Sequence, residues 1–298
     1  MSTVEANFAE HRGLMFSVAY RILGSVTDAE DVVQETWLRW SGADRAAVEE
    51  PKAYLARIAA NLAVDRLRAE QARRETYYGP WLPEPILTEH DPATDAVAAD
   101  SVSLAMLVVL ETLSPLERAV FVLHEVFAFS HTEIAVALER SEAAVRQAAH
   151  RAREHVQARR PRFQPDPVST QQAIERFFAA AAGGDINALM ELLAPDVTVW
   201  SDGGGKVRAA RAPVTGAKKV AAWLATWSQR PYEGVSFEQM SFRFTEINGT
   251  PGVVLLGPDR VLGILTAELD DTGRIAGVHV VSNPDKLAAV AAGEVHEL

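Results

Sequence analysis

The chain contains no cysteine. A disulfide framework, a thiolate zinc site and a cysteine nucleophile are therefore excluded. The chain also has no apolar run long enough to span a membrane and no pattern of a secretory signal peptide, so we expect a cytosolic protein without membrane contact. Its eight histidines offer no metal-binding spacing with a third ligand, and we expect neither a metal nor a cofactor.

Basic residues are in the minority. Lys and Arg number 29 against 40 Asp and Glu, which gives a net charge of −11. Averaged over the chain, this balance argues against a protein that binds nucleic acid. The basic residues are concentrated, however: residues 139–162 hold seven arginines against three acids, and residues 52–75 hold six basic residues against three acids. An acidic chain thus contains two locally basic segments.

Prolines divide the 298 residues at two places. Three prolines within residues 161–167 interrupt a helical pattern, and residues 76–99 hold four prolines and a glycine. Helical periodicity dominates before residues 161–167, and strand-like alternation dominates after them. The predicted organisation is a helical domain at 1–75, a linker at 76–100, a second helical domain at 101–163 and a C-terminal domain at 164–298.

Residues 1–75 show three stretches of helical periodicity. Thr27, followed by Glu30, predicts a capping box at the start of the second helix. The third helix follows Pro51 and places its apolar residues on one side. The opposite side carries polar residues at helical spacing, namely Arg57, Asn61, Asp65 and Arg68.

Capping boxes also predict helix starts in the second helical domain. Ser114 and Ser130 are each followed by glutamate three residues later, and Ser141 caps a further helix. Only a short turn at residues 138–141 separates the helices that follow Ser130 and Ser141. This spacing indicates a helix-turn-helix.

The helix after this turn is the stronger DNA-binding candidate, because its arginines can neutralise phosphates. Its exposed residues would face the major groove, where arginine reads guanine and glutamine reads adenine. The residues placed there are Glu142, Ala143, Arg146, Gln147 and His150. The alternative is a solvated helix whose arginine-rich C-terminal half suits its own dipole.

Residues 52–75 form the second basic element. Tyr54 and Asn61 lie on the same side of the predicted helix as Arg57. An aromatic ring and an amide among basic residues suit melted DNA, where unstacked bases need a stacking surface and a hydrogen-bonding edge. On spacing alone, an ordinary surface helix fits equally well.

Four segments in fixed order carry a family resemblance. They are DAEDVVQETWLRW (28–40), YLARIAANLAVDRLR (54–68), LSPLERAVFVLHEV (113–126) and SHTEIAVALERSEAAVRQAAHRARE (130–154). Jointly they resemble the regions of extracytoplasmic-function sigma factors over residues 8–160. One departure is visible, because the family usually has glycine where this chain has Glu139. That left-handed position of the turn must be either strained or displaced.

The resemblance implies core RNA polymerase and promoter DNA as partners. Residues 8–75 would be the second sigma region, which binds the polymerase clamp and melts the minus-ten element. Residues 102–160 would be the fourth region, which reads the minus-thirty-five element. Carried over by position, the clamp contact falls on Asp28, Asp31, Glu35 and Arg39; the minus-ten contact on Tyr54, Arg57, Asn61, Asp65 and Arg68; and the minus-thirty-five contact extends to Arg151 and Arg153.

The C-terminal domain is similar to SnoaL-like domains of the nuclear-transport-factor-2-like fold. The implied fold class is multidomain: two all-α sigma-type domains, the second with a helix-turn-helix, followed by an α+β cone-shaped SnoaL-like domain with a curved mixed sheet. Strand-like runs are expected at 235–245, 253–256, 260–269 and 274–281.

Three short motifs resemble the sigma-factor subgroup that bears this fused domain. They are WLPEP, with Trp81, Pro83 and Glu84; DGGGK, with Asp202, Gly203, Gly204, Gly205 and Lys206; and NPDKL, with Asn283, Pro284, Asp285, Lys286 and Leu287. Glycines allow close backbone approach, and a tryptophan between prolines is a natural anchor. We expect the C-terminal domain to clamp the linker and to modulate the sigma factor in place of a separate anti-sigma protein, in either direction. A plain turn is the alternative for each motif.

Two other functions are compatible with the sequence. One is a ligand-responsive helix-turn-helix regulator that senses a small molecule of unknown identity in the C-terminal cavity. The other is a cyclase or isomerase of the SnoaL-like fold, with His279 or Asp196 as general acid or base. For that reading, His279 would share a strand face with Ile275 and Val281, and the pocket walls would be Trp200, Trp223 and Trp227. A lone histidine on an apolar strand face is more commonly a core residue.

Overall fold

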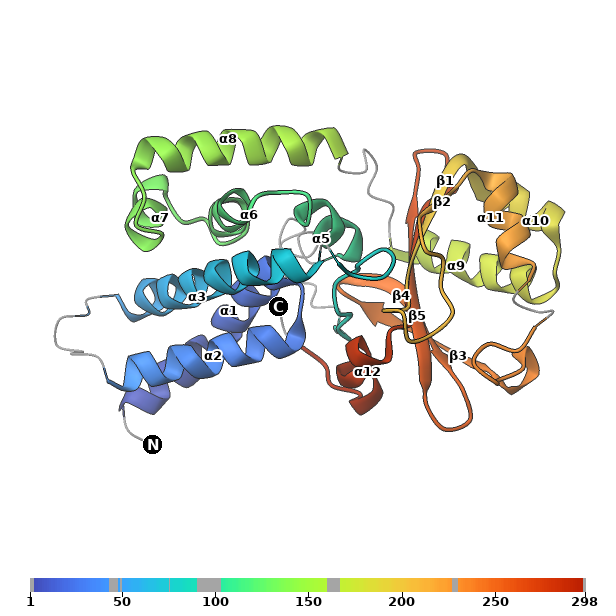
Figure 1. The fold of residues 1–298 in the computed structure, drawn as a ribbon, viewed down its shortest axis with the longest axis horizontal. Helices are drawn as coiled ribbons and strands as arrows, with labels where there is room; N and C mark the ends of the chain where they lie inside the picture. Colours follow the sequence, from blue (N-terminus) through green and yellow to red (C-terminus); the bar gives the residue numbers. More distant parts are fainter. Residues whose placement is uncertain are drawn as a thin grey trace.

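The computed structural model describes residues 3–42, 48, 50–74, 76–89, 103–159, 167–226 and 230–296. A body built of helices lies beside a second body built of a sheet and its covering helices (Figure 1). The expected linker residues 90–100 and the expected boundary at 163 and 164 lie outside the described residues. Within the described ranges, no helix combines the length and the apolar character needed to cross a bilayer.

The first helical unit consists of α1 (Thr3–Leu23), α2 (Val26–Ser41) and α3 (Pro51–Arg74). The three predicted helices are present, but the predicted capping box at Thr27 is wrong. The N-cap of α2 is Ser25, whose hydroxyl accepts the N–H of Asp28 at 3.2 Å. Glu84 of the linker accepts the N–H of Val26 at 2.8 Å. A residue distant in sequence thus satisfies the first turn of the helix, which begins earlier than the local pattern indicates.

The second helical unit consists of α5 (Leu104–Leu110), α6 (Pro115–Phe121), the π-helical turn η2 (Val122–Val126), α7 (His131–Ala137) and α8 (Glu142–Arg159). Both predicted capping boxes are present, at Ser114 and Ser130. The turn between α7 and α8 contains Glu139 with a φ of 53°. The position is therefore strained, because a glutamate adopts the left-handed conformation that suits glycine.

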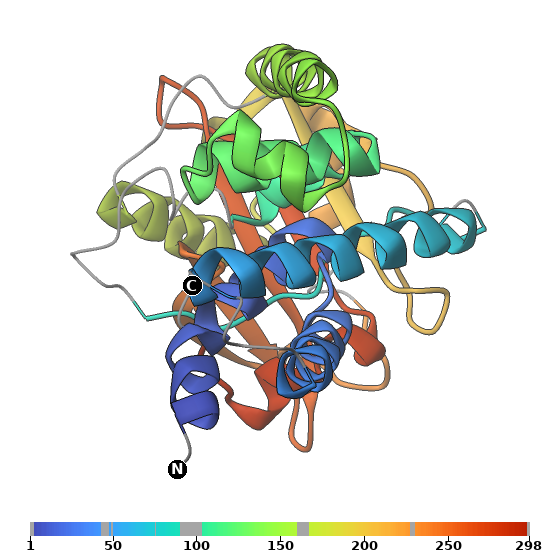
Figure 2. The ribbon, with the colours of Figure 1, turned by 90° about the vertical axis from the view of Figure 1, so that its left-hand side faces the viewer.

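The two helical units are docked on one another. One cluster of buried side chains includes Leu67 of α3, Leu107 of α5 and Leu123 of η2. Contacts join α3 to α6 and α7, and α1 to η2. Figure 2 shows α6 and α7 between α3 and α8, with α8 outermost. The module with the helix-turn-helix therefore shares a hydrophobic core with the module that carries α3.

The second body contains α9 (Pro167–Ala182), α10 (Ile186–Leu192), β1 (Leu193–Asp202), β2 (Val214–Thr215), α11 (Ala217–Leu224), a 3-10 turn η3 (Phe237–Gln239), β3 (Ser241–Ile247), β4 (Thr250–Leu256), β5 (Val261–Leu269), β6 (Ile275–Val281), a 3-10 turn η4 (Pro284–Lys286) and α12 (Ala288–Ala292). The strand order is β2-β1-β6-β5-β4-β3. β1 and β6 run parallel, and the other neighbours run antiparallel. The strand expected from residue 235 begins only at Ser241, because η3 comes first.

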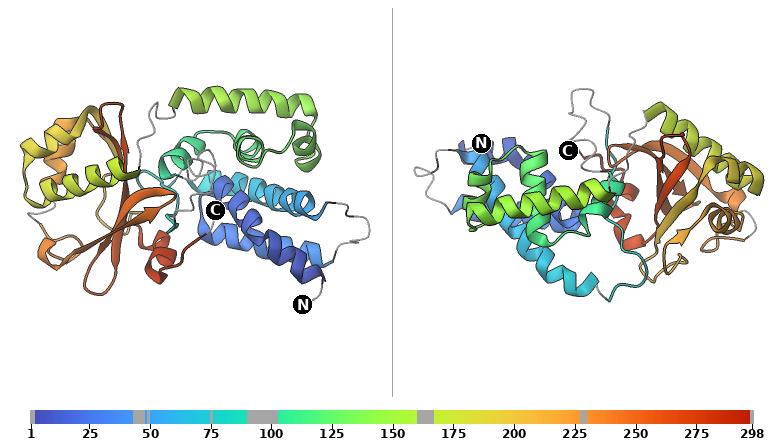
Figure 3. Two further views of the ribbon diagram at one scale, coloured as in Figure 1. Left: turned by 180° about the vertical axis from the view of Figure 1, so that it is seen from behind. Right: turned by 90° about the horizontal axis from the view of Figure 1, so that it is seen from above.

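The sheet is buried on both faces. One face packs against α9, α10 and α11 through side chains such as Phe177, Leu189 and Val220. The other face packs against the linker, α5 and the C-terminal segment through Leu82, Leu104 and Val290. The left view of Figure 3 shows the sheet between its own helices and the helical body. The second face therefore attaches the two bodies to each other.

Linker residues 76–89 cross this second face from β1 to β3. The N–H of Leu82 donates to Asp202 of β1 at 2.9 Å, and Leu87 forms a β-bridge with Ile247 of β3. Between them, the carbonyl of Ile86 accepts the N–H of Asn248 at 3.0 Å. The linker is consequently an ordered strap over these residues.

Candidate nucleic-acid surfaces and the junction that joins them

The polar stripe expected on α3 forms one continuous side of the helix. Arg57, Asp65 and Arg68 are exposed, and Tyr54 and Asn61 are half-buried. The guanidinium of Arg57 lies 5.8 Å from the ring centroid of Tyr54, which is a cation–π contact. Arg68 and Asp65 form an exposed ion pair at 3.0 Å. The stripe thus offers an aromatic ring, an amide and two guanidinium groups.

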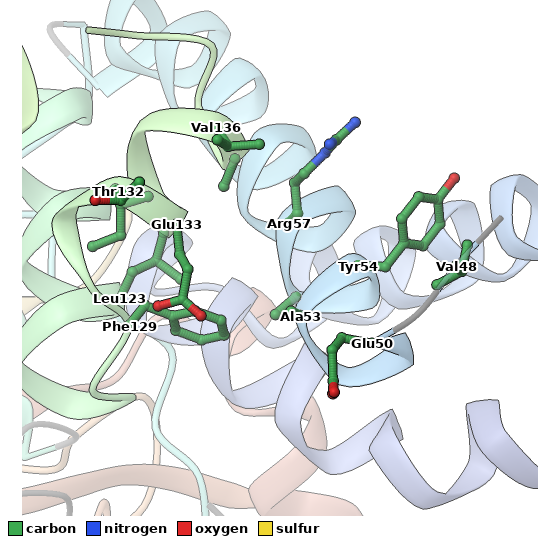
Figure 4. A pocket seen from close by; sticks show the side chains of 13 residues that line it. Val48, Glu50, Ala53, Tyr54, Arg57, Leu123, Phe129, Thr132, Glu133 and Val136 are labelled. Atoms are coloured by element: carbon green, nitrogen blue, oxygen red, sulfur yellow. The ribbon is translucent and has the colours of Figure 1, made fainter. Parts of the chain in front are cut away.

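One end of the stripe faces α7. The side-chain N–H of Asn61 donates to the carbonyl of Ala137 at 2.5 Å. Beside this bond, a groove of about 490 Å³ separates α3 from α7, and its lining includes Tyr54, Arg57 and Glu133. In Figure 4 the side chains of Tyr54 and Arg57 point away from Glu133. The docked α7 therefore engages Asn61 and leaves Arg57 accessible.

The residues expected to read DNA from α8 lie on its outer side. Those exposed are Arg146, Gln147, His150 and Arg151, and those half-buried are Glu142 and Arg153. Arg151 pairs with Glu117 of α6 at 2.6 Å, and Arg153 pairs with Glu125 of η2 at 2.6 Å. These two arginines are oriented by carboxylates of neighbouring helices. α8 keeps this face open to solvent even though its module is docked on α3.

The residues expected to contact the polymerase clamp lie on α2 and its border with α3. Arg66 of α3 binds the carboxylates of Asp28 and Asp31 at 3.5 and 3.0 Å, and Glu35 pairs with Arg39 at 2.8 Å. No pattern in the sequence marks the apolar residue beside them. Leu38 of α2 is 67% exposed. Leu38 thus adds an exposed apolar side chain to the face that carries these charged residues.

The three short motifs meet at Asp202, which is fully buried. Its carboxylate accepts the hydroxyl of Tyr77 at 2.6 Å and the N–H of Leu82 at 2.9 Å, and it forms an ion pair with Lys286 at 2.7 Å. Burial raises the pKa of the Tyr77 hydroxyl, and the carboxylate of Asp202 raises it further. The first residue of DGGGK therefore binds both the linker and NPDKL.

Lys286 completes this cluster from the C-terminal side. Its ammonium donates to the carbonyl of Leu82 at 2.5 Å and lies 4.0 Å from the ring centroid of Trp81. The guanidinium of Arg74, at the end of α3, lies 3.7 Å from the same centroid. Burial lowers the pKa of Lys286, and the charge of Asp202 opposes that shift. Trp81 is thus an anchor contacted by cations from both bodies.

The glycines of DGGGK allow this approach. A Cβ on Gly204 would lie 2.4 Å from the amide nitrogen of Asn283, and Gly204 has a φ of 59°. Asn283 is buried and donates to the hydroxyl of Tyr77 at 2.9 Å. Outside the cluster, Lys206 and Asp285 form an exposed ion pair at 2.5 Å. Of the other motif residues, Pro83, Gly203 and Leu287 are buried, and Gly205 and Pro284 are exposed.

A second polar cluster lies where α1, the linker and the turn between β3 and β4 meet. Glu84 accepts the hydroxyl of Ser25 at 2.9 Å, and its carbonyl accepts the hydroxyl of Tyr20 at 2.6 Å. That hydroxyl accepts the side-chain N–H of Asn248 at 2.7 Å, and the side-chain oxygen Oδ1 of Asn248 accepts the N–H of Ile86 at 3.1 Å. Burial raises the pKa values of Tyr20 and Glu84. The sequence gave no sign that Tyr20 and Asn248 contact the linker, because these contacts join segments that are far apart in the chain.

Glu111 joins the two helical modules. Its carboxylate binds Arg74 of α3 and Arg118 of α6. Arg118 is 1% exposed and also donates to the carbonyl of Arg21 at 2.9 Å. Burial lowers the pKa of Arg118, and Glu111 opposes that shift. The carboxylate therefore sits between two cations that belong to different modules.

The residues expected for catalysis do not form one pocket. His279 stacks on Trp200 at 4.9 Å, and Trp200 packs on the sheet face that the linker covers. Trp223 packs on the opposite face, and Asp196 is exposed. Ile275 and Val281 also belong to different faces. The register of β6 shifts near its start, so simple alternation along the strand places the side chains wrongly. Trp227 lies outside the described residues.

Comparisons with known proteins agree with this architecture. The family model for Sigma-70 region 2 matches residues 8–73, that for Sigma-70 region 4 matches residues 103–156, and that for a SnoaL-like domain matches residues 174–282. The predicted fold class is confirmed.

Two proteins of Mycobacterium tuberculosis are similar over almost the whole chain. The ECF RNA polymerase sigma factor SigJ of strain H37Rv is 39% identical over 292 residues, covering 94% of this chain and 92% of the relative. The probable ECF RNA polymerase sigma factor SigI is 29% identical, covering 95% and 94%. The crystal structure of the former matches with a TM-score of 0.76 and 37% identity, over 95% of this chain and 98% of that chain. The chain therefore belongs to the extracytoplasmic-function RNA polymerase sigma factors and carries a SnoaL-like domain fused behind regions 2 and 4.

Proposed function

We propose that the chain binds core RNA polymerase and directs promoter-specific initiation. In this proposal α2 contacts the polymerase clamp through Asp28, Asp31, Glu35 and Arg39. The stripe on α3 contacts the melted minus-ten element, and the outer face of α8 reads the minus-thirty-five element. The observation that supports this most is the presence of two exposed basic faces on separate modules. A protein with a single recognition helix would not need the aromatic and amide groups on α3.

We also propose that the fused domain controls the factor in cis, without a separate anti-sigma protein. The support is the buried cluster of Asp202, Lys286 and Trp81, which fixes the linker between the modules. The linker sets how far α8 can move from α3. We call this cluster the junction: it is closed when Asp202 and Lys286 hold the linker and open when they release it. The two states would therefore differ in promoter use.

For the sheet body we propose a regulatory role and no catalytic step. His279 is 1% exposed and lies under the linker-covered face of the sheet. A general acid or base must reach a substrate, and the linker covers the sheet face on which this imidazole is buried.

A reconstituted reaction tests the proposal with three components: core RNA polymerase, this chain and DNA. Fragments that the mixture transcribes from a random-sequence library should share two conserved elements at a fixed spacing. Gln147→Ala should change the sequence preference of one element, and Asn61→Ala should impair melting of the other. DNA binding by the chain alone with no effect of polymerase would identify a helix-turn-helix regulator instead. No transcription above that of core polymerase would overturn the proposal.

The role of the junction is tested in the same reaction. Trp81→Ala removes the ring between Arg74 and Lys286, and we expect it to change initiation output in one direction. Phe244→Ala, which removes a 38% exposed aromatic ring on β3 outside the junction, is the control and should leave output unchanged. Equal output from the Trp81 variant and the wild type would contradict control through the linker.

A further inference from the structure

An exposed aromatic–cation pair lies just beyond the end of α3. Tyr78 of the linker is 52% exposed. The guanidinium of Arg211, in the loop between β1 and β2, lies 5.2 Å from its ring centroid. The ring also rests against Gly205, where a Cβ would lie 3.3 Å from the Cβ of Tyr78. The linker and the fused domain thus build this pair together, with little space between them.

The loop that supplies Arg211 is basic. Residues 206–211 contain three basic residues and no acid. Lys206 is paired with Asp285, and Arg208 donates to the carbonyl of Pro231 at 3.1 Å and lies over a tyrosine ring. Among the described residues, the partner recorded for Arg211 is the ring of Tyr78 and not a carboxylate. Its N–H donors therefore remain for a ligand, and its charge favours an anion.

A pair of the same kind stands at the other end of α3. Arg57 lies over the ring of Tyr54 there, and both belong to the proposed minus-ten contact. The 20 positions from Tyr54 to Arg74 span about 30 Å at the rise of an α-helix. One pair therefore lies near the start of α3 and the other just beyond its end.

We propose that Arg211 binds a backbone phosphate of promoter DNA beyond the minus-ten contact, and that Tyr78 is its positioning residue. A planar guanidinium can donate two parallel hydrogen bonds to one phosphate, and stacking on a ring fixes its plane while its edge stays free. This inference rests on the proposed function, because it requires promoter DNA alongside α3.

The contact depends on the junction. Tyr77, the residue before Tyr78, is bound to Asp202 and Asn283. Opening of that cluster would carry Tyr78 away from Arg211 and remove the phosphate contact. The closed junction therefore adds affinity for DNA, which gives a direction to the control exerted by the fused domain.

The test uses the full chain with core RNA polymerase and a promoter fragment that this holoenzyme selects from a random-sequence library. Affinity for the fragment is measured from about 50 to about 200 mM salt. Loss of one phosphate contact lowers the slope of log K against log salt by about 0.9, so the affinity of Arg211→Ala should fall about 3-fold less over this range than that of the wild type. Arg243→Ala is the matched control, because Arg243 is exposed on β3 at the far edge of the sheet.

Further variants separate positioning from folding. Tyr78→Phe keeps the ring and should keep the wild-type slope, whereas Tyr78→Ala should lower it. An unchanged slope in Arg211→Ala overturns the inference. A loss of affinity for core polymerase without DNA assigns Arg211 to a protein contact and overturns it as well. If the wild-type holoenzyme selects no fragment, the proposed function fails before any variant is compared.

Discussion

Asp202 and Lys286 together bind the backbone N–H and the backbone carbonyl of one linker residue, Leu82. Their charged atoms are 2.7 Å apart, with 0% and 8% of their side chains exposed. The carboxylate accepts the N–H of Leu82, and the ammonium donates to the carbonyl of the same residue. Both members of this ion pair, which lies within the fused domain, therefore use the linker backbone as a further hydrogen-bond partner.

Breaking this pair from one side should strongly destabilise the fold. Lys286→Met leaves a buried carboxylate without its cation, and we expect the free energy of unfolding to fall by about 3 to 5 kcal/mol. The double variant Asp202→Asn with Lys286→Met leaves no unpaired charge and should lose less. Urea unfolding measures both.

The exposed pair of Lys206 and Asp285 provides the control for that experiment. Its side chains are 53% and 62% exposed, so Lys206→Met should cost less than about 1 kcal/mol. A single variant at Lys286 that is as stable as the control would show that the buried pair contributes little.

Stability should fall as the pH is lowered from 6.5 towards 4. Burial lowers the pKa of His279 from its ordinary value of 6.5 to about 4, despite the Glu268 carboxylate at 3.5 Å. As the pH falls, the unfolded chain therefore takes up a proton at His279 at a higher pH than the folded chain does. The contribution of neutral His279 to the free energy of unfolding is full above pH 6.5 and is lost on acidification. The shift corresponds to at most about 3 kcal/mol.

His279→Gln should flatten this pH dependence, as measured by urea unfolding at several pH values. His150→Gln is the control, because the side chain of His150 is 72% exposed. An equal slope for His279→Gln and the wild type would show that His279 does not titrate between these pH values.

Leu38 should contribute to polymerase binding. Replacement of this 67% exposed side chain by aspartate puts a charge where an interface would exclude water, and we expect an affinity for core polymerase at least about 10-fold weaker. Val168→Asp, at a 63% exposed position of α9, is the matched control. Equal affinities of the two variants would remove Leu38 from the interface.

Glu139→Gly should stabilise the helix-turn-helix. Glu139 has a φ of 53°, a conformation that costs a residue with a side chain about 1 kcal/mol more than glycine. Glu139→Ala keeps the Cβ and should bring no such gain. Thermal unfolding of the three proteins decides the matter, and a loss of stability with glycine would locate the strain elsewhere.

Sequence was most informative where structure is local. Ser114 and Ser130 start their helices as predicted, because each capping box lies within four consecutive residues. The start of α2 was misplaced by two residues: its cap, Ser25 with the N–H of Asp28, is equally local, but Glu84 of the linker also binds the first turn at Val26. A pattern read along one segment contains no information about such a partner.

The candidate sites divide in the same way. Helical spacing was enough to place Arg57, Asp65 and Arg68 on one side of α3. It gave no sign that Asn61 is bonded to α7, because that contact depends on how two modules dock. His279 was expected to share a face with Ile275, but Ile275 lies on the other face because a register shift near the start of β6 breaks the alternation on which the prediction relied.

The route of the linker across the sheet has a mechanical consequence. The strap is fastened near β1 at Leu82 and at β3 at Leu87, and α3 and α5 lie at its opposite ends. A pull from α3 loads the fastening at Leu82 first, whereas a pull from α5 loads the one at Leu87 first. A movement of α3 should therefore detach the linker from the sheet at Leu82 first, and a movement of α5 should detach it at Leu87 first.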